Sequence, residues 1–99
     1  MAFAIIGTMP NGTAEQDFAV AKAAGIFENP PPGALARMAG PTPGGWRVIS
    51  VWDSRESWNR FRSERLEPAF KATGARPPVF EEWDLQAVRF LAQPTPAGG

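Results

Sequence analysis

Short apolar runs alternate with two amphipathic stripes along the chain, and turns rich in proline and glycine separate them. Apolar runs of this length predict strands, and apolar residues spaced i, i+3, i+4 predict helices. The expected strands are residues 3–8, 34–40, 46–52 and 79–91, and the expected helices are residues 13–24 and 53–73. This β-α-β-β-α-β order predicts an α+β, ferredoxin-like fold, a four-stranded antiparallel sheet with two helices on one face.

The helix boundaries have their own signals. Thr13 followed by Gln16, and Asp53 followed by Glu56, both have the spacing of a capping box, which predicts Thr13 and Asp53 as N-cap residues. Pro68 lies inside the second helical stripe. Because proline lacks a backbone N–H, it is expected to kink that helix or to split off its last turn.

Two strands, residues 3–8 and 46–52, are apolar on both faces. Two helices cover only one face of a sheet, so we expect a second copy of the chain to cover the other face in a homodimer. A monomer with a ligand or the chain's own tail on that face is the alternative. Residues 1–91 are expected to form a single domain, and residues 92–99, with two prolines and two glycines, a disordered tail.

Composition narrows the possible functions. Ten Lys and Arg balance ten Asp and Glu, which argues against nucleic acid or an anionic membrane as a partner. No apolar run approaches the roughly 20 residues that span a bilayer, and no signal peptide is recognisable at the start. We therefore expect no membrane association and a cytoplasmic location.

The chain contains no Cys, His or Tyr. A disulfide, a thiolate nucleophile, a Cys/His zinc site, a proximal-His haem and a Ser-His-Asp triad are all impossible without these residues. Acid–base chemistry would have to use carboxylates, Lys, Arg, the backbone or water. Neither helix starts at a phosphate-binding glycine turn, so no flavin or nicotinamide site is predicted. We expect neither a cofactor nor a metal ion.

The most distinctive segment is Gly44–Trp58, which contains the sequence Trp-Asp-Ser-Arg-Glu-Ser-Trp. With the residues that follow it, this segment resembles the strand-then-helix region of small proteins of the dimeric α+β barrel superfamily, of the antibiotic biosynthesis monooxygenase type. The resemblance covers about residues 32 to 90. It implies a ferredoxin-like fold, a dimer with its sheets back to back, and a pocket between each sheet and its own helices.

The resemblance also implies a function. Relatives include oxygenases that need no cofactor, cyclases and haem-degrading enzymes, so a cofactor-independent monooxygenase or cyclase-like enzyme for a small aromatic or polyketide-type substrate is expected. The chain departs from the family where many relatives carry His on the last strand, because Gln86 stands there. The missing His excludes haem degradation. A non-catalytic dimeric module that binds an apolar ligand or another protein is the alternative.

Trp52 and Trp58 are candidates for stacking a flat substrate and for donating indole N–H groups, with packing in the core as the alternative. Trp83 either lines the same space or lies in the dimer interface. The Asn59 amide could hold a carbonyl or peroxide oxygen, or it could lie on a solvated helix face.

Charged candidates complete the set. Arg37 and Arg62 could stabilise an anion, or they could lie at an edge or in a surface ion pair. Glu82, Asp84 and Gln86 form a polar row that could supply a general base, or a solvated edge on which a carboxylate pairs with arginine. The expected catalytic residues are Trp58, Asn59, Gln86 and Asp84, and the expected substrate-binding residues are Arg37, Trp52, Arg62, Trp83 and Glu82.

Overall fold

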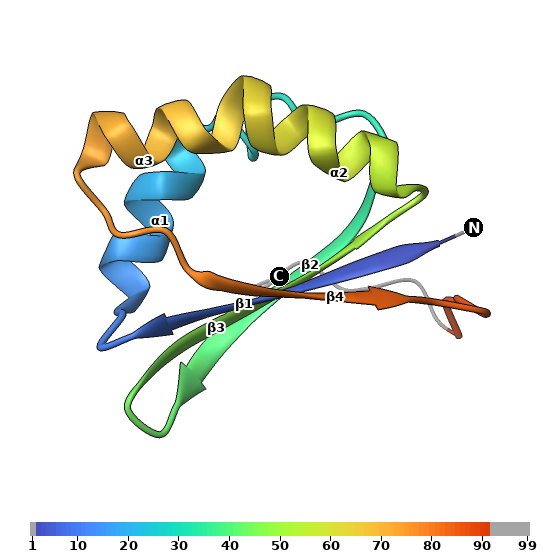
Figure 1. Cartoon of the computed structure of the whole chain (residues 1–99), viewed down its shortest axis with the longest axis horizontal. Coiled ribbons are helices and arrows are strands. Elements are labelled where there is room, and N and C mark those ends of the chain that lie inside the picture. Colours follow the sequence, from blue (N-terminus) through green and yellow to red (C-terminus); the bar gives the residue numbers. More distant parts are fainter. Residues whose placement is uncertain (1, 92–99) are drawn as a thin grey trace.

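The chain folds as the sequence pattern predicts, into one antiparallel sheet with its helices on one side (Figure 1). The computed structural model describes residues 2–91. The elements in chain order are β1 (Phe3–Pro10), α1 (Ala14–Ala23), β2 (Ala34–Thr42), β3 (Gly45–Trp52), α2 (Arg55–Phe61), the π-helical turn η1 (Arg62–Leu66), α3 (Glu67–Thr73) and β4 (Val79–Asp84). The strand order is β2-β3-β1-β4, so the fold is ferredoxin-like.

Strand register decides which side chains face the helices. Phe3 on β1 lies opposite Trp52 on β3, and Ile5 lies opposite Ser50. Successive side chains on a strand point to opposite faces, so these four residues lie on the helix side together. Phe3, Ile5 and Trp52 belong to the buried core beneath the helices.

The first capping box is confirmed and the second is shifted by one residue. Thr13 and Gln16 exchange hydrogen bonds as expected. The second helix is capped by Ser54, whose hydroxyl accepts from the Ser57 N–H, so the prediction of Asp53 as N-cap was wrong. The Asp53 N–H donates to the carbonyl of Gly33 at 2.8 Å, which ties Asp53 to the strand side of the boundary.

The Asp53 carboxylate has a different role from the one expected. It accepts a hydrogen bond from the Ser57 hydroxyl at 2.6 Å and another from the Ser54 hydroxyl at 3.1 Å. These bonds, with the one from Ser57 the strongest, hold the pKa of Asp53 below its ordinary value, because they favour the charged form. The carboxylate thus ties together the two hydroxyl groups at the start of α2.

The disruption expected near Pro68 is present as a π-helical turn. The Glu67 N–H donates to the carbonyl of Arg62, five residues back, and α3 begins at Glu67. Pro68 therefore lies in the first turn of α3, where its missing N–H costs little.

The last strand is shorter than expected. β4 ends at Asp84, whereas the sequence predicted an extended segment to Leu91. The reason is the length of its partner: Asp84 lies opposite Phe3, the first residue of β1, and the Leu85 N–H makes one further bond to the Ala2 carbonyl. The predicted tail, 92–99, lies outside the described residues.

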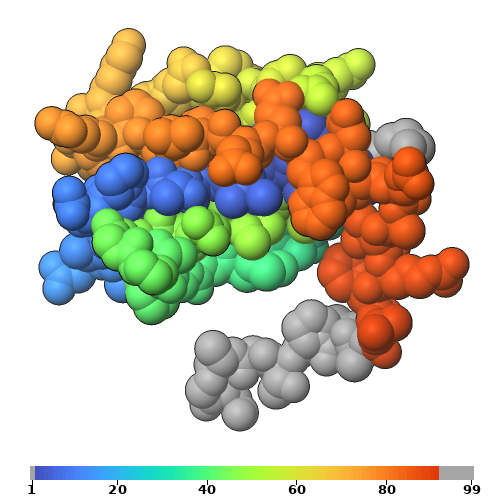
Figure 2. Space-filling model, turned by 60° about the horizontal axis from the view of Figure 1, so that its bottom comes forward, coloured from blue at the N-terminus to red at the C-terminus, as the bar shows by residue number. Residues whose placement is uncertain are grey.

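The face of the sheet away from the helices carries apolar side chains, as expected. Figure 2 brings this face forward. Met38 on β2, and Val79 and Trp83 on β4, are exposed there, while Ile49 on β3 is partly buried. Among the helices of residues 2–91, none is long and apolar enough to cross a membrane.

Arg65 on η1 joins the helix layer to the loop between α1 and β2. Its guanidinium donates to three backbone carbonyls, those of Ala24 at 2.8 Å, Gly25 at 2.9 Å and Asn29 at 2.6 Å. Two of these carbonyls lie at or just beyond the end of α1, where helical partners are missing. Arg65 therefore fixes both the end of α1 and the loop that follows it.

We predict that Arg65→Ala lowers the free energy of unfolding by about 2–3 kcal/mol, because carbonyls lose a charged donor. Urea unfolding followed by circular dichroism measures the change. Arg60→Ala is the matched control, since Arg60 is exposed on the same run of helices. Equal stability of the two variants would contradict the assignment of this role to Arg65.

Candidate functional site

A cavity of about 440 Å³ lies between the sheet and the helices. The strands form its floor, α1 and the loop to β2 form one wall, and the helices from α2 to α3 form its roof. Its lining is mainly apolar, from Ile5, Met9, Val20, Val48, Leu66, Phe70 and Phe80, among others. An apolar cavity of this size is typical of a small-molecule site.

Small residues keep this space open. Gly7 lies in the floor, and a Cβ atom there would lie 3.2 Å from the Phe80 ring. Ala21 on α1 and Ala36 on β2 also line the cavity with minimal side chains. Pro30 and Pro31 stiffen the loop that closes one side, as the run of three prolines would suggest.

Aromatic rings form the part of the cavity wall nearest α2. The Trp52 and Trp58 ring centroids lie 5.7 Å apart, and those of Trp52 and Phe61 lie 5.2 Å apart. Trp58 also meets Phe80 edge to face at 5.3 Å. Such a wall offers ring faces and edges to a flat ligand.

The two indole N–H groups differ in what they bind. Trp52 Nε1 donates to the Ser50 hydroxyl at 2.9 Å. Trp58 is only 2% exposed, and its Nε1 has no hydrogen-bond partner among the described residues. An unpaired buried donor costs free energy, and a ligand acceptor would remove that cost.

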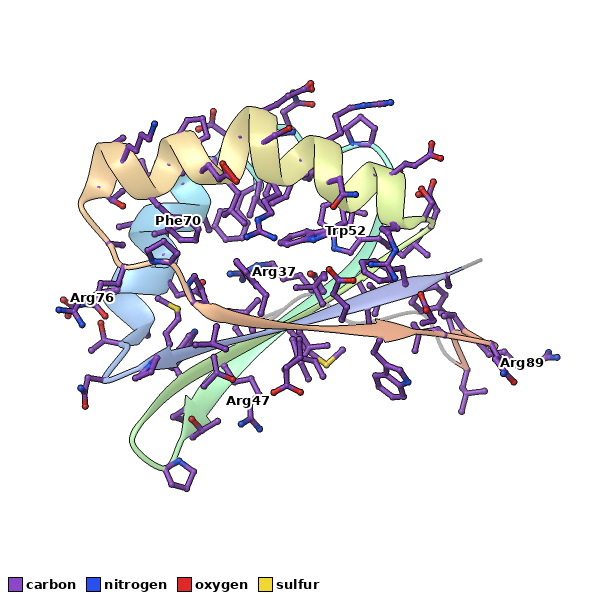
Figure 3. The ribbon with its side chains drawn as sticks, viewed as in Figure 1. Arg37, Arg47, Trp52, Phe70, Arg76 and Arg89 are labelled. Atoms are coloured by element: carbon purple, nitrogen blue, oxygen red, sulfur yellow. The ribbon has the colours of Figure 1, made fainter. Side chains whose placement is uncertain are left out.

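One ion pair lies at this mainly apolar surface. Arg37 Nη2 donates to Asp17 Oδ1 at 2.5 Å, and the side chains are 26% and 13% exposed respectively. They are the only charged residues among those lining the cavity in the described part of the chain. Figure 3 shows Arg37 between the sheet and the helices, on the same side of the sheet as Trp52 and Phe70.

Three of the nine expected site residues line the cavity, namely Arg37, Trp52 and Trp58. Asn59 is exposed on α2. The Arg62 guanidinium carbon lies 5.0 Å from the Phe80 ring centre, and Arg62 Nε lies 3.7 Å from the Glu67 carboxylate. Neither Asn59 nor Arg62 is among the lining residues.

The residues expected on the last strand also lie outside the cavity. Glu82 and Asp84 both form ion pairs with Arg55, the latter at 3.2 Å. Trp83 is 58% exposed on the opposite face of the sheet, and Gln86 lies beyond the end of β4. The catalytic roles expected of Asn59, Asp84 and Gln86 stay predictions, since none of these three residues lines the cavity.

Asp17 is the cavity residue that sequence reasoning missed. It lies three and four residues before Val20 and Ala21, so it shares their side of α1. A carboxylate on the apolar side of a helix was the available signal. Asp17 was overlooked because it lies in the first turn of α1, where acidic residues are common since they interact favourably with the helix dipole.

The site therefore combines an aromatic slot with a small set of polar groups. Arg37, the Ser50 hydroxyl and the Trp58 N–H are hydrogen-bond donors, and Asp17 is an acceptor. Donors arranged in an apolar cavity stabilise a developing oxyanion strongly. Within residues 2–91, no three His, Cys, Asp or Glu side chains are grouped as a metal site would require.

These features define a class: a small ferredoxin-like α+β protein with an apolar pocket between its sheet and its helices. No family model matches the sequence, and no curated protein is similar to it. Solved structures are similar. One is a protein from Chloroflexus aurantiacus J-10-fl, provisionally assigned as an antibiotic biosynthesis monooxygenase, with 19% identity, a TM-score of 0.64, and coverage of 93% of this chain and 100% of the other.

Two further structures are similar over the same part of the chain. SnoaB, a cofactor-independent oxygenase from Streptomyces nogalater, has 16% identity and a TM-score of 0.58, with 93% of this chain and 97% of SnoaB covered. Rv0793 from Mycobacterium tuberculosis has 14% identity and a TM-score of 0.64, with 93% and 100% covered. The chain thus has the fold of antibiotic biosynthesis monooxygenase-like proteins, which confirms the resemblance seen in the sequence.

We predict that Val48→Phe weakens the binding of the neutral apolar dye N-phenyl-1-naphthylamine by at least about tenfold, or about 1.4 kcal/mol. Val48 lies opposite Gly7 in the cavity floor, so the added ring would occupy the space that a ligand needs. Dye fluorescence in a titration measures the affinity. The matched control, Val79→Phe, changes an exposed position outside the cavity lining and should leave the affinity unchanged. Equal losses in both variants would place the dye elsewhere.

Proposed function

We propose that this protein is a cofactor-independent monooxygenase that oxidises a small aromatic or polyketide-type molecule in the cavity between its sheet and its helices. The observation that carries the proposal is the cavity itself, an apolar slot with an aromatic wall and one ion pair. The likeness of the fold to SnoaB, a cofactor-independent oxygenase, supports it.

The substrate would supply its own electrons to O₂. A ring ketone with an activated CH₂ group loses a proton to give an electron-rich enolate, which can react with O₂. The CH₂ group becomes C=O, one oxygen atom enters the product, and the other leaves as water with both hydrogen atoms of that group. The protein's task is then to bind the ring, promote loss of the proton, stabilise the anion and exclude water.

The cavity residues match this task. Trp52 and Trp58 would contact the ring, and the free Trp58 N–H would donate to the enolate oxygen. Arg37 would contribute positive charge beside the same oxygen. The apolar lining strengthens both interactions, because charges and dipoles interact more strongly where water is absent.

We predict that the protein consumes O₂ in the presence of anthrone, a tricyclic ketone with an activated CH₂ group. Trp58→Phe should slow this reaction by about 10²-fold, because it removes one donor to an oxyanion but keeps an aromatic ring. An oxygen electrode measures the rate. Trp83→Phe is the matched control, since Trp83 lies on the other face of the sheet.

The alternative function, a non-catalytic module that binds an apolar ligand, gives a different result in this assay. Anthrone would quench tryptophan fluorescence, as expected for a ligand beside Trp52 and Trp58, but no O₂ would be consumed. Binding without consumption would replace the monooxygenase proposal with this alternative.

We further propose that two copies pair through the helix-free faces of their sheets. Trp83 and Met38 are exposed on this face and apolar. Arg47 and Glu81, of opposite charge, also point to it, so the face is neutral and can match its own copy across a two-fold axis. Figure 3 shows Arg47 on the side away from the helices.

Light scattering at micromolar concentration should therefore give twice the chain mass. Trp83→Glu should raise the dissociation constant of the dimer by at least about 100-fold, because a buried unpaired charge costs several kcal/mol. Trp83→Phe keeps an apolar ring and should stay dimeric. A wild-type protein that is monomeric at this concentration would rule out pairing of the sheets.

A further inference from the structure

We propose that Asp17 is the proton acceptor of the cavity, and that the Asp17–Arg37 ion pair selects ring compounds with an acidic C–H or O–H group. This inference rests on the proposed function for the identity of the reacting molecule. It also extends that function, because it assigns the base and the chemical feature that a substrate must have.

Position supports the assignment. Among the described residues, Asp17 is the only carboxylate that lines the cavity. The carboxylates expected on β4, those of Glu82 and Asp84, are bound to Arg55 outside it. Backbone hydrogen bonds and the capping box at Thr13 keep α1, and with it Asp17, in place.

The energetics of the pair also point to function. Both side chains are mostly buried, since only 13% of the Asp17 side chain and 26% of the Arg37 side chain are exposed. Removing two charges from water costs several kcal/mol for each ion, and their attraction seldom returns more than this. Apolar residues of similar size would stabilise the fold at least as well, so folding alone does not account for the pair.

Transfer of a proton to Asp17 would move charge without creating any. Before the step, Arg37 is paired with the Asp17 carboxylate. In the step, the substrate C–H or O–H bond breaks, its electrons stay on the substrate, and the proton bonds to an Asp17 oxygen. The carboxyl group becomes neutral and the substrate becomes an anion. Arg37 then pairs with that anion, and the cavity keeps a net charge of zero.

This exchange lowers the main barrier to anion formation in an apolar space. An isolated anion there would lose its hydration with nothing to replace it. Beside Arg37 the new anion meets a cation that is already buried. A guanidinium has five N–H donors, so N–H groups remain for a substrate oxygen while one of them still bonds Asp17.

Ser50 adds a second donor at the same place. It lies opposite Arg37 in the register of β2 and β3, and both side chains line the cavity. Its oxygen accepts from Trp52 Nε1, which leaves the hydroxyl hydrogen free to donate to a substrate oxygen. The site thus has one acceptor for a proton, and Arg37 and Ser50 join the Trp58 N–H as donors for the oxygen that receives the charge.

Proton removal can be measured apart from oxidation. In D₂O without O₂, the CH₂ hydrogens of anthrone exchange for deuterium when a base removes them, and NMR follows the loss of their signal. We expect the wild-type protein to accelerate this exchange above the buffer rate, and Asp17→Asn to lower the protein-dependent rate by at least about 100-fold. The new amide oxygen can still accept from Arg37, so the packing of the pair is retained.

Two variants separate a base from a structural residue. Asp17→Glu keeps a carboxylate and should retain part of the exchange activity. Glu15→Gln removes an exposed charge from the same helix and should match the wild type. Circular dichroism and quenching of tryptophan fluorescence by anthrone check that each variant is folded and binds the probe.

The inference fails if the wild-type protein binds anthrone without accelerating exchange, or if Asp17→Asn exchanges at the wild-type rate. Failure of the proposed oxygenase looks different. In that case exchange depends on Asp17 in the absence of O₂, yet no O₂ is consumed when it is admitted, and the assignment of Asp17 as the proton acceptor stands.

Discussion

The alternation of side chains across β1 and β3 is the constraint on which the rest of the structure depends. Both strands are apolar on both faces, and the two helical segments of the chain can cover only one of them. The helix layer therefore settles on the side of Phe3 and Trp52, and small residues such as Gly7 leave a cavity beneath it. On the opposite face Ile49 and Val51 are only partly buried, and Met38, Val79 and Trp83 on the neighbouring strands are exposed. One pattern thus produces both the pocket and the apolar face through which we propose that two copies pair.

Most of the fold could be predicted because its signals are local. Strand and helix periodicity, proline and glycine turns and the capping box at Thr13 each depend on neighbouring residues. The predicted boundaries were wrong where residues distant in the sequence determine the end of an element. β4 ends at Asp84 because β1 offers no further partner, and Ser54 rather than Asp53 caps α2 because Asp53 is bonded to Gly33. No local pattern contains the length of a partner strand or the position of Gly33.

The same difference between local signals and contacts of distant residues explains which site residues could be predicted. Arg37 was found as a charge within a strand, Trp52 as a large ring at the end of a strand, and Trp58 as a large ring in the helix that follows that strand. Asp17 was missed because an acidic residue in the first turn of a helix is ordinary, and only its contact with Arg37, 20 residues away, distinguishes it. Charged residues along an edge strand attract attention in a sequence, but ion pairing across the surface can account for them fully.

The π-helical turn shifts the phase of the roof over the cavity. Each residue of an α-helix turns by about 100°, so residues five apart, such as Phe61 and Leu66, would point in clearly different directions. The wider turn brings both into the cavity lining and directs Arg65 toward the end of α1. The turn acts as a one-residue insertion absorbed by the helix. Deletion of one residue from the turn would restore the regular α-helical phase, and Phe61 and Leu66 would no longer both face the cavity. The number of residues in this turn therefore determines the shape of the pocket.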